Sequence, residues 1–210
     1  MKRDSRDLAR AIAKRTLDLI IAVIGLIVIM PIWLVTALLI RIESQGKIFF
    51  RQERVGRNQE TFKMYKFRTM IEGAQNLGSG LFSYENDPRI TRVGQKLRQS
   101  SLDETPQLLN ILKGNMSIVG PRPPVIGELE IEHDLPESYE NRFTVLPGIT
   151  GLAQISGRNA LNWKDKIEFD LVYIEKFKNL GIVLDLTIIL KTIFIVIARK
   201  NIVEKEKNDD

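Results

Sequence analysis

Residues 19–40 have the sequence LIIAVIGLIVIMPIWLVTALLI, an apolar stretch without a charged side chain. At about 1.5 Å per residue, a helix of this length can just cross the hydrocarbon core of a bilayer. The stretch is not a cleavable signal peptide, because it is too long and no small-residue cleavage site follows it. The sequence therefore predicts a membrane anchor near the N-terminus.

Basic segments flank this apolar stretch on both sides. Residues 2–15 hold six basic against two acidic residues, a net +4, and residues 41–57 hold five against two, a net +3. Because the whole chain carries +5, the remainder is slightly acidic. Anionic lipid headgroups suit such a placement of charge better than nucleic acid does.

The apolar stretch has two possible topologies. The simpler one is a transmembrane helix kinked at Pro31, which removes a backbone N–H and crowds the carbonyl of Ile27. A spanning helix usually keeps its basic excess on the cytoplasmic side alone, whereas both flanks are basic here. We therefore expect a re-entrant membrane helix over residues 17–41 that breaks at Pro31 and returns, after a basic interfacial segment at residues 1–16.

Residues 42–200 are long enough for one hydrophobic core, and we expect a single domain of mixed α/β fold there. Turn signals and alternation predict strands at 47–52, 61–69 and 117–119, and a strand or loop at 148–155. Helical periodicity predicts helices at 91–99, 103–113 and 162–178. Residues 182–199 are apolar but include Asp185 and Lys191, so an amphipathic helix in the membrane interface and a core helix both remain open. Residues 201–210 form a charged tail.

The composition excludes several kinds of site. Without cysteine, the chain has no disulfide framework, thiolate metal site or cysteine nucleophile. His133 is the only histidine, and no neighbouring pattern supports a zinc site or a catalytic triad.

Asp103-Glu104 begins a predicted helix, and two helix starts fit the sequence. With Ser101 as N-cap, the stretch forms a capping box that needs no function. With Asp103 as N-cap, Pro106 falls where no intrahelical bond is lost, and we prefer this start. In both cases Asp103 lies at the positive end of a helix, near Arg98. An ionised carboxylate there suits attack on phosphorus or the binding of magnesium, although capping alone also accounts for it.

Several basic side chains lie where predicted elements meet loops, which is where sites are usually built. They are Lys66, Arg68, Arg98, Arg122 and Arg158. Flanking prolines fix the backbone of Arg122, and a guanidinium matches phosphate oxygens. A solvated surface charge is the alternative for each of the five. Asp170 falls on the apolar stripe of the helix at 162–178, where we expect a structural salt bridge.

Eight motifs follow one another in a fixed order along the chain. They are FFRQ at 49–52 with RVG at 54–56, YKFRTM at 65–70, DPRIT at 87–91, SLDETPQL at 101–108, GNMS at 114–117, VGPRP at 119–123, PGITG at 147–151 and QISGRN at 154–159. From about residue 14 to residue 200, this set resembles the bacterial sugar transferase family, the monotopic phosphoglycosyl transferases.

The resemblance implies a ping-pong reaction on a compact cytoplasmic catalytic domain. The aspartate matching Asp103 attacks the β-phosphate of a UDP-sugar, UMP leaves, and polyprenyl phosphate accepts the phosphosugar. Mg²⁺ lies near Asp103, and Glu104 supports it. The membrane partners are polyprenyl phosphate and lipids at the cytoplasmic face of the inner membrane. The family's re-entrant helix breaks at a Ser-Pro pair, where this chain has Met30-Pro31.

The resemblance also assigns the basic residues. Arg98 would hold phosphate, Arg122 would lie at the active site, and Lys66, Arg68 and Arg158 would bind substrate. Two other functions would keep the membrane anchor: a non-enzymatic adaptor, and a glycosyltransferase that releases UDP instead of UMP. A nucleic-acid binder does not fit, because aromatic and basic residues do not interleave on one face. The sequence does not reveal which sugar is transferred.

Overall fold

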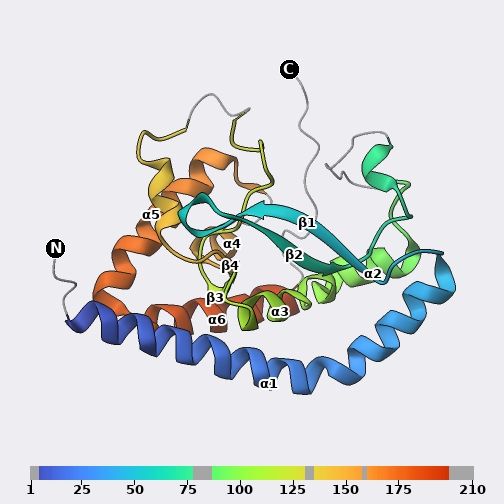
Figure 1. Ribbon diagram of the computed structural model, residues 1–210, viewed down its shortest axis with the longest axis horizontal. Helices are drawn as coiled ribbons and strands as arrows, with labels where there is room; N and C mark the ends of the chain where they lie inside the picture. Colours follow the sequence, from blue (N-terminus) through green and yellow to red (C-terminus); the bar gives the residue numbers. More distant parts are fainter. Residues whose placement is uncertain (1–4, 78–86, 131–134, 158–159, 199–210) are drawn as a thin grey trace.

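The computed structural model of the protein describes residues 5–77, 87–130, 135–157 and 160–198 (Figure 1). Two small sheets have helices packed around them. The first pairs β1 (Phe49–Val55) with β2 (Thr61–Phe67) in antiparallel register, and the second pairs β3 (Ser117–Val119) with β4 (Gly148–Thr150) in parallel. The helices are α1 (Ser5–Glu43), α2 (Arg92–Ser100), α3 (Gln107–Leu112), α4 (Leu152–Ser156), α5 (Trp163–Leu180) and α6 (Ile182–Ile197). Short 3₁₀ turns are η1 (Arg57–Gln59), η2 (Ala74–Asn76), η3 (Leu102–Glu104) and η4 (Tyr139–Thr144). The fold is mixed α/β, as expected.

Helix α1 covers both the expected interfacial segment from Ser5 onward and the expected membrane helix. The helix does not break at Pro31, which corrects that expectation: residues on both sides of the proline stay helical. A proline deletes one intrahelical hydrogen bond, and the neighbouring bonds can carry the helix past it. Figure 1 shows the result as a bend, after which the second limb of α1 rises towards α2.

Both limbs of α1 contact the same body of the protein. In the first limb, Asp18 and Ala22 are buried, and Asp18 accepts a hydrogen bond of 3.0 Å from the backbone N–H of Ile118. In the second limb, Ile40 packs with Phe67 and Leu97, while Trp33 makes edge contacts with the rings of Phe49 and Phe67. The outward face is apolar and exposed, with Ile20, Ile24, Ile27, Val28, Leu34, Val35, Leu38 and Ile42 among its residues. In the described part of the chain, α1 is the one helix long and apolar enough to cross a membrane.

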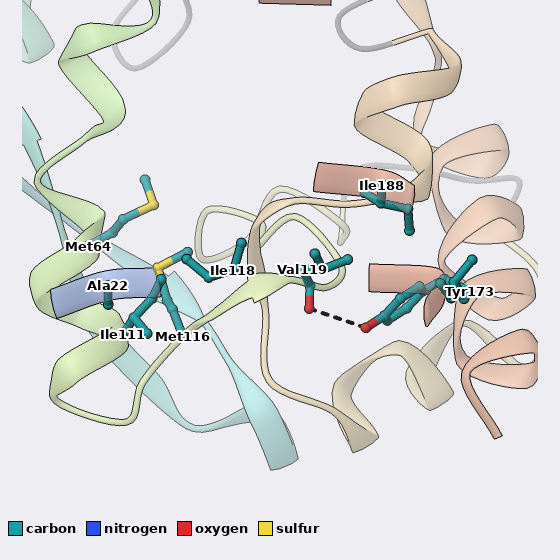
Figure 2. Close-up of a cluster of buried hydrophobic side chains, with 9 residues drawn as sticks. Ala22, Met64, Ile111, Met116, Ile118, Val119, Tyr173 and Ile188 are labelled. Carbon is teal, nitrogen blue, oxygen red and sulfur yellow. Dashed lines mark hydrogen bonds between the residues drawn. The ribbon is translucent and has the colours of Figure 1, made fainter. Parts of the chain in front are cut away.

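The main core lies where α1, α3, β3, α5 and α6 meet (Figure 2). Its buried side chains are Ala22, Met64, Ile111, Met116, Ile118, Val119, Tyr173, Leu184 and Ile188. Alternation along β2 turns Met64 into this cluster and Phe67 into the smaller one beneath Trp33. The Tyr173 hydroxyl donates to the Val119 carbonyl at 3.3 Å, the dashed line in Figure 2. The core therefore fixes β3, and with it the turn that follows at residues 120–124.

Residues 182–199 were expected to form either an interfacial helix or a core helix. The structure has α6 there, and its two faces differ. One face is core: Asp185 is 1% exposed and its Oδ2 pairs with the Lys14 Nζ of α1 at 2.6 Å. The opposite face is apolar and exposed at Val183, Leu190 and Phe194. Helix α6 is thus both a core helix and part of the exposed apolar surface. The segment expected as a strand or loop at 148–155 is β4 followed by α4.

Candidate active site

The chain around Asp103 is a 3₁₀ turn, and the helix begins only after it. Ser101 has a left-handed backbone (φ 58°), η3 spans Leu102–Glu104, and α3 starts at Gln107. Pro106 explains the delay, because without an N–H it cannot continue the α-helical pattern. The surrounding bonds run from residue i to i−3, such as Thr105 N to the Leu102 carbonyl at 3.2 Å.

The α-helix begins at neither expected start, although Ser101 does precede the 3₁₀ turn η3 as its N-cap residue. Neither η3 nor α3 has a side-chain cap hydrogen bond, so Asp103 is not an N-cap and Ser101 does not form a capping box. The Asp103 side chain is consequently not used by the backbone next to it.

Asp103 differs from the other buried carboxylates of the described residues. Asp18 accepts from a backbone N–H, Asp87 pairs with Arg89, Asp170 with Arg142 and Asp185 with Lys14. Asp103 is 9% exposed, and in the described part of the chain no donor lies within hydrogen-bond or ion-pair distance of its carboxylate. A buried carboxylate without a direct donor is costly for folding alone.

Three cations surround Asp103 without pairing to it. Glu104 takes two of them: its Oε1 lies 2.7 Å from Lys66 Nζ and 3.3 Å from Arg122 Nη2. The third is Arg98, whose Nε donates to Thr69 Oγ1 at 2.9 Å. Burial and the charge of Glu104 raise the pKa of Asp103 to about 6, against the opposing influence of Lys66, Arg98 and Arg122. Burial also lowers the pKa of Lys66, and Glu104 opposes that shift.

Of the other two predicted residues, Arg68 has a different set of partners. It is 8% exposed and donates to the carbonyls of Ser44 and Gln45 at the end of α1. Gly46 follows these two residues with φ 113°, a left-handed backbone conformation that favours glycine. Arg68 also lines the same cavity as Asp103 and Glu104. Arg158 and the charged tail at 201–210 lie outside the described residues.

The site faces a cavity of about 1600 Å³. Lys66, Arg98, Asp103, Glu104 and Arg122 line one part of it, and the apolar residues Ile189, Ile193 and Val196 of α6 line another. This volume exceeds the usual range of about 300–1000 Å³ for small-ligand pockets. The cavity therefore has room for a charged group and an apolar group together.

The donor set fits magnesium only when a ligand completes it. No group of three or more carboxylate, histidine or cysteine side chains is placed to hold a metal among the residues that the structure describes. Within the described ranges no donor pairs with the Asp103 carboxylate, whereas Glu104 pairs with Lys66 and Arg122. Magnesium commonly binds one or two carboxylates together with phosphates of the substrate, and this arrangement suits that mode.

One buried residue next to the site was not predicted from the sequence. Arg142 of η4 is 2% exposed, and its Nη2 lies 2.8 Å from Asp170 Oδ2 and 2.7 Å from the carbonyl of Arg122. The expected salt bridge of Asp170 is thus confirmed. Its partner could not be named, because Arg142 lies in a polar stretch without a periodic pattern.

The family of the chain follows from its similarity to known proteins. The chain belongs to the bacterial sugar transferase family, which it matches over residues 9–199. It is 42% identical over 196 residues to the exopolysaccharide production protein ExoY of Sinorhizobium fredii, covering 87% of this chain and 84% of that protein.

Two longer relatives have more specific names. The UDP-glucose:undecaprenyl-phosphate glucose-1-phosphate transferase of Escherichia coli is 40% identical over 86% of this chain and 39% of its own length. The UDP-N-acetylgalactosamine-undecaprenyl-phosphate N-acetylgalactosaminephosphotransferase of Aeromonas hydrophila is 41% identical over 87% of this chain and 43% of its own length. This chain therefore corresponds to less than half of each.

Proposed function

We propose that the chain transfers a sugar 1-phosphate from a UDP-sugar to a polyprenyl phosphate and releases UMP, an early membrane step of glycoconjugate assembly. The observation that carries the proposal is the Asp103 carboxylate, which is buried beside three cations and has no direct donor in the described part of the chain. The named activities of the Escherichia coli and Aeromonas relatives support the same reaction class.

The first step forms a bond between an Asp103 oxygen and the β-phosphorus of the donor. The bond from that phosphorus to the oxygen bridging the two phosphates breaks, and UMP leaves with the electron pair. In the second step a phosphate oxygen of the lipid attacks the same phosphorus, and the aspartyl bond breaks. Asp103 is regenerated, and the product is a sugar joined to the lipid by a diphosphate. An ionised nucleophile serves this chemistry, and the charges of Lys66, Arg98 and Arg122 lower the pKa of Asp103 against the burial that raises it.

The basic side chains beside Asp103 can stabilise the two anions that react here, the Asp103 carboxylate and the substrate phosphate. Lys66, Arg98 and Arg122 stabilise the phosphate charge that develops during transfer. Glu104 holds Lys66 and Arg122 in place through its ion pairs, so it supports the site without reacting. Magnesium bound by Asp103 and the diphosphate would neutralise charge on the donor.

The packing of α1 supports a re-entrant topology. Arg15 of the first limb donates to the Ile111 carbonyl at 2.9 Å, and Glu43 at the far end accepts from Arg92 N and Val93 N at 2.8 and 2.9 Å. A straight span would carry one of these ends across the bilayer, away from the shared body. We propose that both ends lie on the cytoplasmic side, where UDP-sugars are made, and that the outer face of α1 enters the lipid.

Trapping the covalent adduct tests the reaction. Enzyme mixed with UDP-sugar and magnesium, without lipid, should gain the mass of a phosphosugar and release UMP. Asp103→Asn keeps the size of the side chain and should show neither the adduct nor turnover. Asp165→Asn, outside the cavity, is the matched control and should behave as the wild type. Release of UDP, or normal UMP release by Asp103→Asn, would refute the proposal.

A further inference from the structure

The turn that carries Arg122 has few means of holding its own shape. Residues 121–124 are Pro-Arg-Pro-Pro, so Arg122 supplies the one backbone N–H of the four. Hydrogen bonds to its carbonyls must therefore fix the turn.

Each of the four carbonyls accepts a hydrogen bond, and the donors come from β1, β4 and η4. Pro121 O accepts from Gly148 N at 2.9 Å, and Pro124 O from Val55 N at 3.0 Å. The two between them accept from arginine side chains: Pro123 O from Arg54 Nη1 at 2.9 Å, and Arg122 O from Arg142 Nη2 at 2.7 Å. Arg142 therefore donates to the backbone carbonyl of Arg122, the residue whose side chain lines the site.

Arg142 is itself held rigidly. Its Nε and Nη2 lie 3.1 and 2.8 Å from Asp170 Oδ2, and its guanidinium lies 5.1 Å from the ring centre of Trp163 and 5.4 Å from that of Phe143. The planar fork of arginine can reach two acceptors at once, which a lysine ammonium does with less directional control.

We infer that Arg142, with Asp170 as its counter-ion, is a positioning residue that aims Arg122 at Glu104 and at the phosphates of the substrate. Its buried charge is neutralised by Asp170, so it does not compete with Arg122 for the anion. That Arg122 binds the phosphates of the substrate rests on the proposed function. That Arg142 holds the turn at residues 121–124 rests on the contacts alone.

The test separates folding from positioning. Arg142→Met leaves Asp170 buried without its cation and should lower both stability and UMP release. Arg142→Met combined with Asp170→Leu replaces the ion pair by apolar groups, an exchange that is often neutral for stability. The double variant should therefore melt close to the wild type while its UMP release stays at least about tenfold low, the scale of losing one charge-assisted contact. Arg142→Lys, which keeps the charge, gives a second measure in case Arg142→Met fails to fold, and it should lose activity with little loss of stability.

The decisive comparison adds Arg122→Ala. In the wild type this change should lower UMP release strongly, whereas in the Arg142→Met, Asp170→Leu background it should cost less than about twofold more, because Arg122 is already misplaced. Additive losses would overturn the inference. Lys178→Met breaks the exposed 2.8 Å pair with Glu175 on the same α5 and should change nothing.

A readout without turnover keeps this inference separate from the reaction. Hydrogen exchange at the Arg122 N–H, followed by mass spectrometry of a peptide spanning the turn, should speed up in the double variant without a global change. Unchanged exchange would overturn the positioning role even where activity falls. Absence of UMP release from the wild type would instead refute the proposed function and leave the exchange result to decide this point.

Discussion

Lys14→Met tests how strongly the first limb of α1 is joined to the body. The Lys14 ammonium donates to Asp185 Oδ2 at 2.6 Å and to the Val119 carbonyl at 3.0 Å, and lies 3.8 Å from Asp18 Oδ1. Methionine fills a similar volume and removes the charge. Asp185 is 1% exposed, and among the residues that the structure describes its remaining side-chain donor is then the Tyr173 hydroxyl at 2.9 Å.

The expected loss in the free energy of unfolding is large. Removing one partner of a buried ion pair costs about 3–5 kcal/mol, because the other charge stays buried without compensation. Against a total stability of about 5–15 kcal/mol this is a major fraction. For a chain of this size it corresponds to a fall in Tm of roughly 6–20 °C in a thermal melt of the detergent-solubilised protein.

The pH dependence gives the sign of the effect. Burial already raises the pKa of Asp185, and Lys14 opposes this, so the pKa rises further in Lys14→Met. A carboxylate whose folded pKa is above its unfolded value favours the fold at low pH and loses that contribution as pH rises through the folded pKa. The deficit of Lys14→Met should therefore narrow as the pH is lowered from 8 towards about 5. The other ionisable groups facing Asp185 are Asp18 and Tyr173.

A second change controls for packing. Lys14→Met together with Asp185→Leu removes both charges and should recover most of the lost stability. A Tm of Lys14→Met within about 3 °C of the wild type at pH 8, less than 1–2 kcal/mol, would refute the reasoning. So would a deficit that stays constant with pH.

Three further predictions concern the start of α2, the metal and the topology of α1. Glu43→Ala removes the carboxylate that accepts from the first two N–H groups of α2 and should cost about 1–2 kcal/mol, measured as a lower Tm, with Glu72→Ala as the exposed control. Chelation of magnesium should suppress both the covalent adduct and UMP release and be reversed by added magnesium, whereas activity that persists with the chelator would contradict the metal's role. A cysteine at Ser5 in this cysteine-free chain should stay unlabelled by a membrane-impermeant thiol reagent outside intact cells, and labelling there would show that α1 spans the bilayer.

Local rules predicted the elements well where one face of each was apolar. Residues 162–178 have an N-cap at Asn162, whose Oδ1 accepts from Asp165 N at 2.8 Å, and the structure begins α5 at the next residue. The helix at 91–99 is likewise capped by Thr91. In both cases a side-chain cap and a helical period agree, and the bounds differ by one or two residues.

Local sequence rules could not predict the ion-pair partners that lie far away in the chain. The sequence indicated that Asp170 and Asp185 stood out on apolar helices, but their cations come from Arg142 on a 3₁₀ turn and Lys14 on the far end of the chain. Nothing in the local pattern of either basic residue marks it as buried. Arg68 has a further role that its place at a strand end did not indicate, because its two Nη atoms donate to the carbonyls of Gln45 and Ser44 just after α1.

The failed prediction of a cap at Asp103 is informative about the site. A carboxylate at a helix start ordinarily lowers its own cost by accepting backbone N–H groups. Pro106 delays the helix to Gln107, so the N–H groups that such a cap would bind are not offered to Asp103. Every other buried aspartate among the described residues has a donor, and this one lies next to Glu104, which pairs with Lys66 and Arg122. Pro106 therefore leaves the Asp103 carboxylate oxygens unused by the backbone. Attack on phosphorus requires such an available oxygen.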